Sequence, residues 1–434
     1  METRIVKIKS PSQLGHFRDA AGSSRLEAWQ VASEPAESVA ALQHAADYLR
    51  TSDVPVAFPT ETVYGLGADA TRSPSVKGIY SAKGRPSDNP LIIHVCDLQM
   101  LRDLLGGQDV PSIYTPLIER FWPGPLTILL PNPQPSKLAP EVTSGLKTFG
   151  ARMPLTPLAL SLIKLAGVPL AAPSANASTK PSPTLAQHVK DDLEGRIELI
   201  LDGGHCDVGV ESTVVDGLCD PPAVLRPGGI GLDQLRSCPG WENAVKVYKD
   251  QSEEGKAAPR APGMKYKHYS PKARVVLYEA TYGDGRDGVT ASDVEALKAR
   301  GNGSAMATND AASRKVGVIR TQRWGPAAGL TSLEPQDNRN GHDRNQDVDD
   351  GDPKILFNIQ QGALVDEAGH SFGHVLDIDL GKETRGIAQG LFSALRALDR
   401  CGAEMIFVDG IEDEIDIAAA VMNRLRKAAS EIRS

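Results

Sequence analysis

An apolar segment runs directly into polar residues at positions 168–176, where the chain reads Val168-Pro169-Leu170-Ala171-Ala172-Pro173-Ser174-Ala175-Asn176. The first five of these residues predict a buried strand, so Ser174 and Asn176 follow its carboxyl end. In α/β sheets this edge is where ligands bind. The segment therefore predicts a ligand site where a strand ends.

Similar polar runs follow apolar runs at many places between Pro59 and Arg226. They are rich in hydroxyls, amides, Arg and Lys, which are the groups that hold phosphate and carboxylate. None has the Cys or paired-His spacing of a metal or thiol enzyme, so we expect no protein-held metal. The runs occupy residues 59–67, 83–86, 89–94, 144–148, 152–154, 173–176, 210–214 and 225–229. Together they predict one pocket for a nucleotide-sized anion.

The length of 434 residues favours two domains. The formal net charge of −8 gives no general attraction to nucleic acid or anionic membrane. Residues 330–353 hold seven acids and two bases, so they supply −5 of that charge. The rest of the chain is close to neutral and has room for a local basic cleft.

The five cysteines are widely spaced and include no C-x-x-C pair, which favours a reducing compartment. No apolar run approaches the roughly 20 residues that span a bilayer. The first residues contain an early acid and no apolar core, unlike a secretory signal. We therefore expect a cytoplasmic protein without membrane contact, and the first ~35 residues leave a mitochondrial pool open.

Apolar periodicity predicts alternating helices and strands. Helices are expected over residues 38–50, 73–83, 158–166, 383–400 and 417–429, and one more from Ser182, which is expected to be its N-cap. Strands are expected over residues 54–58, 91–95, 126–130, 168–172, 197–201, 212–215, 274–278, 316–319 and 405–408. This alternation predicts an α/β class with a mixed sheet. Residues 249–272 are expected to be a linker, and residues 330–353 a disordered insertion.

Several polar residues allow two interpretations. Lys83 and Arg85 flank Gly84 at the expected end of a helix, where they either clamp an anion or are solvated. His94 is either a core histidine or a ligand contact. Thr62, like Thr60, is either a turn former that bonds its own backbone or part of the site.

Two arginines lie in apolar stretches, and this favours a functional interpretation. Arg152 and Arg226 each need a carboxylate or phosphate partner if they are partly buried. Ser182 combines a capping role with phosphate binding, because helix N-termini bind phosphate. Ser212 has no nearby His in sequence, so nothing supports a Ser-His-acid nucleophile.

Two nucleotide-binding motifs are unconvincing or absent. Residues 283–288 spell G-x-G-x-x-G, but the two aspartates within them would repel a pyrophosphate, so a turn is the better interpretation. No G-x-x-x-x-G-K-[ST] motif is present, so an ATP site here is not a P-loop.

These runs, in this order, resemble the Sua5/YrdC/YwlC family, the threonylcarbamoyl-AMP synthases. The resemblance covers residues 38–247, and residues 261–271 look like the interdomain linker of the family. Residues 420–428 look like its second, Sua5-type domain. The resemblance implies an N-terminal extension (1–37), a YrdC-like catalytic domain (38–248), a linker (249–273) and a smaller Rossmann-like α/β Sua5 domain (274–434).

The resemblance also implies the reaction. Members make L-threonylcarbamoyl-adenylate from L-threonine, bicarbonate or CO₂, and ATP bound with Mg²⁺, and they release pyrophosphate. The product feeds the tRNA threonylcarbamoyl transferase machinery, which modifies adenosine 37 to t6A. Direct contact of the chain with tRNA is left open.

The implied site residues fall into three groups. The positions expected to hold threonine are Thr62, His94, Arg152, the backbone of Ala172, and Ser212. The positions expected to hold ATP are Lys83, Arg85, Asn89, Thr148, Ser174, Asn176, Ser182 and Arg226. A flap over the cleft is expected from the linker, with Arg260, Lys265, His268 and Tyr269. Catalysis is expected to rest on positioning, by Lys83 and Arg85 among others, and no covalent nucleophile is expected.

Two other function classes remain open at this point. A non-catalytic tRNA-binding protein of the same fold is the main alternative, although the aromatic content of 5% argues weakly against stacking on bases. Carbamoyl transfer, as in hydrogenase maturation proteins, is disfavoured because those proteins carry zinc-finger segments and this chain has no C-x-x-C.

Overall fold

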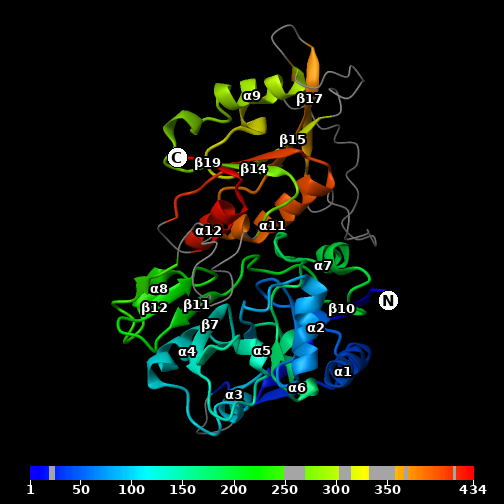
Figure 1. Cartoon of the computed structure of the whole chain (residues 1–434), viewed down its shortest axis with the longest axis vertical. Helices are drawn as coiled ribbons and strands as arrows, with labels where there is room; N and C mark the ends of the chain where they lie inside the picture. Colours follow the sequence, from blue (N-terminus) through cyan, green and yellow to red (C-terminus); the bar gives the residue numbers. More distant parts are fainter. Residues whose placement is uncertain (19–24, 249–268, 303–313, 332–356, 366–369, 414–416) are drawn as a thin grey trace. The chain divides into compact units, whose positions relative to one another are not determined.

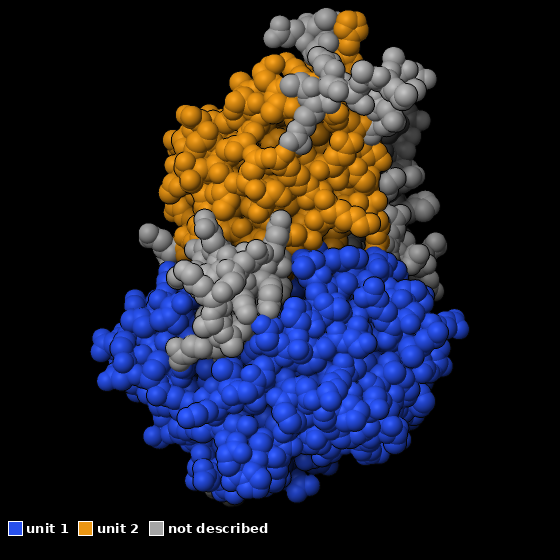
Figure 2. All heavy atoms as spheres, viewed as in Figure 1, with its two compact units in different colours: residues 1–268, 415–420 blue, residues 269–414, 421–434 orange. Residues whose placement is uncertain are grey.

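A computed structural model describes residues 1–18, 25–248, 269–302, 314–331, 357–365, 370–413 and 417–434. These residues form two compact units, residues 1–268 with 415–420 and residues 269–414 with 421–434. Figure 1 shows the path of the chain, and Figure 2 shows the two units in different colours. Each unit contains its own sheet and helices, which confirms the predicted α/β class.

The first unit is built on an eleven-stranded sheet in its described part, with the order β1-β10-β4-β5-β9-β6-β8-β7-β11-β12-β13. The strands are β1 (Arg4–Lys7), β4 (Val56–Pro59), β5 (Tyr64–Asp69), β6 (Ile92–His94), β7 (Leu126–Pro131), β8 (Thr148–Arg152), β9 (Leu170–Ala171), β10 (Leu199–Asp202), β11 (Thr213–Asp216), β12 (Ala223–Arg226) and β13 (Val245–Lys246). The sheet contains both parallel and antiparallel pairs, so it is mixed, as predicted. A separate ribbon pairs β2 (Gly15–Phe17) with β3 (Trp29–Val31).

Helices cover this sheet on the face that holds the main core. They are α1 (Ala36–Thr51), α2 (Ser73–Lys83), α3 (Leu98–Leu104), α4 (Thr115–Phe121), α5 (Pro140–Thr143), α6 (Pro157–Ala166), α7 (Ala186–Leu193) and α8 (Leu232–Arg236), with short 3₁₀ turns η1 (Pro11–Gln13) and η2 (Ser112–Tyr114). Helix α1 packs against α6 and buries Leu42, Ala45, Ala46 and Leu49, the face expected from its 3.6-residue period.

The two faces of the central strands differ in their surroundings. Ile93, Ile128 and Ala151 lie in the large core. Their strand neighbours Ile92 and Leu129 belong to a second, small apolar cluster. Because side chains alternate between faces along a strand, the polar residues at even positions of β6 and β8 lie on the face away from the main core.

Helix α2 ends where the sequence predicts. Gly84 caps it in the left-handed conformation (φ 60°), which glycine adopts without a Cβ clash. Lys83 therefore stands in the last turn, and Arg85 lies just beyond it.

Two expectations about the first unit need correction. Helix α7 begins at Ala186 with Leu185 as its N-cap, so Ser182 is not a capping residue. Residues 1–37, predicted as an extension outside the catalytic domain, contribute β1, which pairs with β10 at one edge of the sheet.

The second unit contains a six-stranded sheet in its described part, with the order β16-β17-β15-β18-β14-β19. Its strands are β14 (Arg274–Tyr278), β15 (Lys315–Arg320), β16 (Gln360–Val365), β17 (Ser371–Asp379), β18 (Met405–Asp409) and β19 (Glu431–Arg433), and its helical segments are η3 (Gly283–Gly285), α9 (Ala291–Asn302), η5 (Pro326–Gly329), α11 (Thr384–Arg400) and α12 (Ala418–Ala428). All pairs are parallel except β16 with β17. Because parallel strands are covered on both faces, residues 275–278 are all buried. This is the predicted Rossmann-like arrangement.

Some predicted features fall outside the described residues. These are residues 249–268 of the linker and residues 332–353 of the acidic insertion. Within the described residues, no helix is both long and apolar enough to cross a membrane.

Candidate active site

Strand register brings several predicted threonine contacts into one row across the first sheet. His94 of β6 pairs with Arg152 of β8. Thr127 of β7 lies one step beyond the pair Ile128–Ala151 and so stands opposite Arg152. Val214 of β11 pairs with both Thr127 and Arg226. Residues 94, 152, 127 and 226, distant in sequence, therefore lie within the five successive strands β6, β8, β7, β11 and β12.

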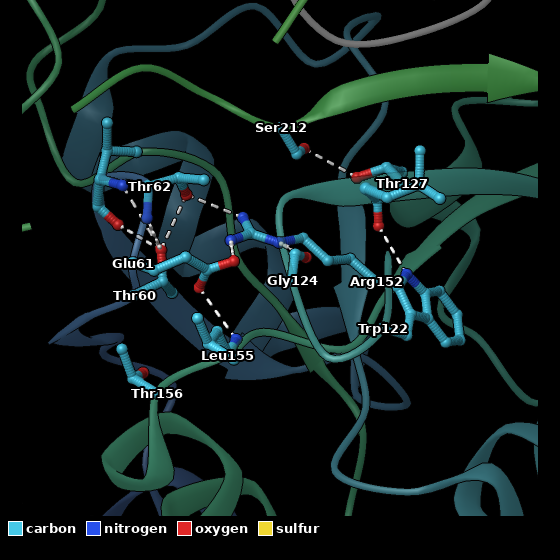
Figure 3. Close-up of polar contacts among 12 residues, drawn as sticks. Thr60, Glu61, Thr62, Trp122, Gly124, Thr127, Arg152, Leu155, Thr156 and Ser212 are labelled. Carbon is cyan, nitrogen blue, oxygen red and sulfur yellow. Dashed lines mark hydrogen bonds and ion pairs between the residues drawn. The ribbon is translucent and has the colours of Figure 1, made fainter. Parts of the chain in front are cut away.

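Arg152 is the centre of a buried polar cluster at the end of β8 (Figure 3). Its Nη2 donates to Glu61 Oε1 at 2.7 Å, its Nη1 to Thr62 Oγ1 at 2.9 Å, and its Nε to Gly124 O at 3.2 Å. The side chain of Arg152 is 5% exposed and that of Glu61 is 1% exposed. The predicted need of Arg152 for an anionic partner is met by Glu61, a residue of its own chain.

Thr60 and Thr62 have different roles: one is a turn former and the other is part of the site. Thr60 Oγ1 accepts from the backbone N–H of Thr62 at 3.2 Å and donates to Val63 O at 2.8 Å. Thr60 is thus a turn former between β4 and β5. Thr62 directs its hydroxyl to Arg152 and to Thr60 (Figure 3).

His94 is fully buried beside the Arg152 guanidinium. Burial, with the positive charge of Arg152, lowers the pKa of His94 to about 3. Its Nδ1 atom is buried and has no hydrogen-bond partner among the described residues. Buried polar atoms are rarely left unpaired, so His94 offers a neutral imidazole to a ligand.

Ser212 is held by two neighbours. Thr127 Oγ1 and Ser212 Oγ lie 2.8 Å apart, and Arg226 donates to Ser212 Oγ at 3.0 Å and to Ser212 O at 2.9 Å. Arg226 is therefore hydrogen-bonded to Ser212, the residue that follows Glu211. Ala172, predicted to act through its backbone, donates its N–H to Ile92 O at 3.0 Å.

Predicted ATP contacts form a second group around the end of β9. Lys83 Nζ donates to Asn176 O at 2.6 Å and to Ser174 O. Ser174 Oγ donates to Asn176 Oδ1 at 2.6 Å. Ser182 Oγ donates to the carboxylate of Glu211. Lys83 thus bonds the strand end itself in this structure, where the resemblance places it beside phosphates.

Backbone hydrogen bonds connect the two groups. The N–H of Ala175 donates to Tyr64 O and the N–H of Tyr64 donates to Pro183 O, each at 2.8 Å. Ser174 also forms an isolated bridge with Gly65. The segments that carry Thr62, Ser174 and Ser182 are therefore neighbours.

The remaining predicted ATP contacts lie in the segment between α2 and β6 and at the start of β8. Asn89 is 1% exposed, and its Oδ1 has no hydrogen-bond partner among the described residues. Arg85 Nη2 donates to Pro90 O at 3.2 Å. Thr148 begins β8, four residues before Arg152, which corresponds to about 13 Å along a strand. By alternation it lies on the same face as Arg152.

Sequence reasoning missed two residues of this site. Glu61 stands inside one of the polar runs, and its position between two threonines was the available signal. Thr127 lies within the apolar strand β7 and gave no signal. For the predicted flap, Arg260, Lys265 and His268 lie outside the described residues. Tyr269 lies in the second unit, with its ring stacked on Phe392 at a centroid distance of 5.2 Å.

Fold and site together define an α/β protein that presents buried cationic, hydroxyl and neutral imidazole groups on one face of a mixed sheet. A family model described as "Telomere recombination" matches residues 49–228, and one described as "Threonylcarbamoyl-AMP synthase, C-terminal domain" matches residues 230–430.

Relatives match over almost the whole chain. Threonylcarbamoyl-AMP synthase of Schizosaccharomyces pombe is 41% identical over 100% of this chain and 97% of its own. That of Bacillus subtilis is 39% identical over 89% and 92%. The crystal structure of P. abyssi Sua5 complexed with L-threonine superposes with a TM-score of 0.69 at 34% identity and covers 99% of both chains. The chain belongs to the threonylcarbamoyl-AMP synthases of the long, two-domain Sua5 type.

Proposed function

We propose that the chain makes L-threonylcarbamoyl-adenylate from L-threonine, bicarbonate or CO₂, and ATP, and releases pyrophosphate. The observation that carries this is that His94 pairs with Arg152 in the sheet, while Ser212 is hydrogen-bonded to Thr127, which stands opposite Arg152. Two buried atoms, His94 Nδ1 and Asn89 Oδ1, have no hydrogen-bond partner among the described residues. Cationic and neutral polar groups at one site suit a small zwitterion next to a polyphosphate. The P. abyssi relative solved with L-threonine supports threonine as the amino acid.

The chemistry requires positioning more than a reactive side chain. The amine of threonine adds to CO₂ to give a carbamate and releases a proton. A carbamate oxygen then attacks the α-phosphorus of ATP, and the bond to the bridging oxygen of pyrophosphate breaks. Holding the two anions in line and offsetting charge as pyrophosphate leaves are the tasks left to the protein.

The site divides these tasks between its two groups of residues. Thr62, His94, Arg152, the Ala172 carbonyl and Ser212 would hold threonine. Arg85, Asn89, Thr148, Ser174, Asn176, Ser182 and Arg226 would hold ATP, with Lys83 fixing the strand end that carries Ser174 and Asn176. Exclusion of water from the labile carbamate would fall to the linker flap.

Magnesium would enter with ATP. The two buried acids of the site are already engaged, since Glu61 accepts from Arg152 and Glu211 accepts from Ser182. This donor set fits an ion held mainly by the phosphates. When bound, Mg²⁺ would offset part of the phosphate charge.

The product would pass to a tRNA threonylcarbamoyl transferase that forms t6A at adenosine 37. We place this activity in the cytoplasm, with a mitochondrial pool left open. A product with a mixed acid anhydride bond hydrolyses readily in water, so prompt transfer to the next enzyme is required.

Mass detection of threonylcarbamoyl-AMP after incubation with threonine, bicarbonate and ATP-Mg²⁺ tests the proposal. Product is expected only when all three substrates are present. Pyrophosphate that appears equally without bicarbonate, or with serine in place of threonine, would contradict the substrate assignment.

Substitution of the predicted clamp provides the first variant test. Arg85→Ala is expected to abolish product formation at an unchanged melting temperature, because it removes a cation that is expected to hold ATP and that lies just beyond the end of α2. Arg226→Ala is expected to lose activity and stability together, since it also holds Ser212. Arg4→Ala, at a 54% exposed ion pair on the sheet edge, is the control. Normal turnover in Arg85→Ala would rule out the clamp.

A further inference from the structure

Three hydrogen bonds fix the Arg152 guanidinium in a single orientation. A guanidinium has five N–H donors, one on Nε and two on each terminal nitrogen. Gly124 O, Thr62 Oγ1 and Glu61 Oε1 accept one from each nitrogen. One N–H on Nη1 and one on Nη2 have no acceptor among the described residues. These two donors are left for a ligand, and guanidinium N–H groups pair well with a carboxylate.

Glu61 is itself fixed from a second side. Its Oε2 accepts the backbone N–H of Leu155 at 2.9 Å, while Oε1 takes Arg152 Nη2 at 2.7 Å. Leu155 lies three residues after Arg152, in the segment that leaves β8. The carboxylate therefore bridges the side chain of Arg152 and the backbone just beyond it (Figure 3).

We propose that Glu61 is a positioning residue for threonine binding, acting through Arg152. Glu61 holds one terminal N–H of the guanidinium and so turns the two remaining N–H donors toward the carboxylate of threonine. It does not touch the substrate. This inference rests on the proposed function, because it assigns the carboxylate of threonine to Arg152.

The decisive variant is Glu61→Gln. The amide keeps the length of the side chain but has one oxygen, so either Arg152 or the N–H of Leu155 must face an NH₂ group. We expect the KM for threonine and the threonine Kd from calorimetry to rise about tenfold, as for the loss of one charge-assisted hydrogen bond. The KM for ATP is expected to stay within twofold.

A matched control separates positioning from folding. Asp97 is also a buried carboxylate at 1% exposure, with an ion pair to Lys164 at 2.9 Å and two backbone donors, the N–H of Met100 at 2.9 Å and the N–H of Trp29 at 3.2 Å. It lies outside the site. Asp97→Asn is expected to lower the melting temperature to a similar extent as Glu61→Gln, without a change in the KM for threonine.

A double-mutant comparison tests the route through Arg152. If Glu61 acts only by orienting Arg152, the double variant Glu61→Gln with Arg152→Lys is expected to have the same KM for threonine as the single variant Arg152→Lys. Independent effects would instead multiply, and that result would overturn the proposal. Glu61→Asp, which keeps the charge but ends one methylene earlier, is the second variant, with an expected rise smaller than that of Glu61→Gln.

The outcomes distinguish this inference from the proposed function. If the wild-type chain makes no threonylcarbamoyl-AMP, the proposed function fails. If the wild-type chain makes it and every folded Glu61 variant keeps the wild-type threonine KM, only the role of Glu61 fails.

Discussion

At the residue scale, the buried charge of Arg152 determines which ligand groups the site can bind. Arg152 is almost completely buried. Removing one partner of a buried ion pair costs more free energy than forming the pair contributes. The guanidinium of Arg152 has three hydrogen-bond acceptors, and the lowered pKa keeps the neighbouring His94 neutral. A neutral His94 can accept or donate one hydrogen bond without repelling Arg152, which suits a site for a zwitterion.

His94 should make folding stability depend on pH. Its pKa in the folded state is about 3, below the ordinary value near 6.5, so the unfolded chain binds the extra proton first. Stability therefore falls as pH drops below 6.5, by about 2 kcal/mol between pH 7 and pH 5. His94→Gln is expected to remove that part of the loss.

Urea unfolding at pH 7, 6 and 5 measures this difference. Tryptophan fluorescence reports mainly on the first unit, because Trp29, Trp122 and Trp241 lie there. His44→Gln, at an exposed position of α1, is the control. Equal pH slopes for the wild type and His94→Gln would show that His94 is not held neutral by the fold.

At the scale of elements, the sequence predicted most of what positions the site. The end of α2 at Lys83 and strands near 91–95, 126–130 and 168–172 are confirmed within a few residues. Thr62 is hydrogen-bonded to Arg152, and Ser212 is hydrogen-bonded to Thr127, which stands opposite Arg152. Strand order across the sheet was not predictable, since it depends on pairings between segments far apart in sequence. For the same reason Thr127, in an apolar strand, could not be assigned to the site.

Close backbone approach between β11 and the loop after β12 gives an element-scale prediction. A Cβ at Gly228 would stand 2.1 Å from Thr213 N and 2.2 Å from the carbonyl carbon of Ser212. Gly228→Ala must therefore separate these segments and move Ser212. We expect a loss of about 1–3 kcal/mol in the free energy of unfolding, as for overpacking, and at least a tenfold lower kcat/KM for threonine.

Thermal unfolding and steady-state kinetics check the Gly228 prediction together. Gly283→Ala is the matched control, because a Cβ there meets no atom within 4 Å. If Gly228→Ala keeps wild-type activity, then Ser212 does not depend on the packing of this loop.

At the scale of the whole molecule, the prediction of two domains agrees with the two compact units. The boundary between these units differs from the expected domain boundary. The second unit begins at Tyr269, whereas the sequence favours residue 274. The reason is a long-range contact, since the Tyr269 ring stacks on Phe392 and lies 5.8 Å from the Arg424 guanidinium. The composition of residues 249–273 is typical of a linker. Composition does not indicate that one of these residues packs against a residue far away in the sequence.

Separate sheets and cores predict that the units fold independently. Every strand of the eleven-stranded sheet lies between residues 4 and 246, and the main core of that unit lies between Ile8 and Ala244. A fragment of residues 1–248 is expected to unfold cooperatively on heating. A fragment of residues 1–216 is the contrast, because it lacks β12 and the fully buried Trp241, and it is expected to show no cooperative transition. Circular dichroism of both fragments during heating measures this difference. Gradual unfolding of the 1–248 fragment would mean that the core of the first unit depends on the second unit.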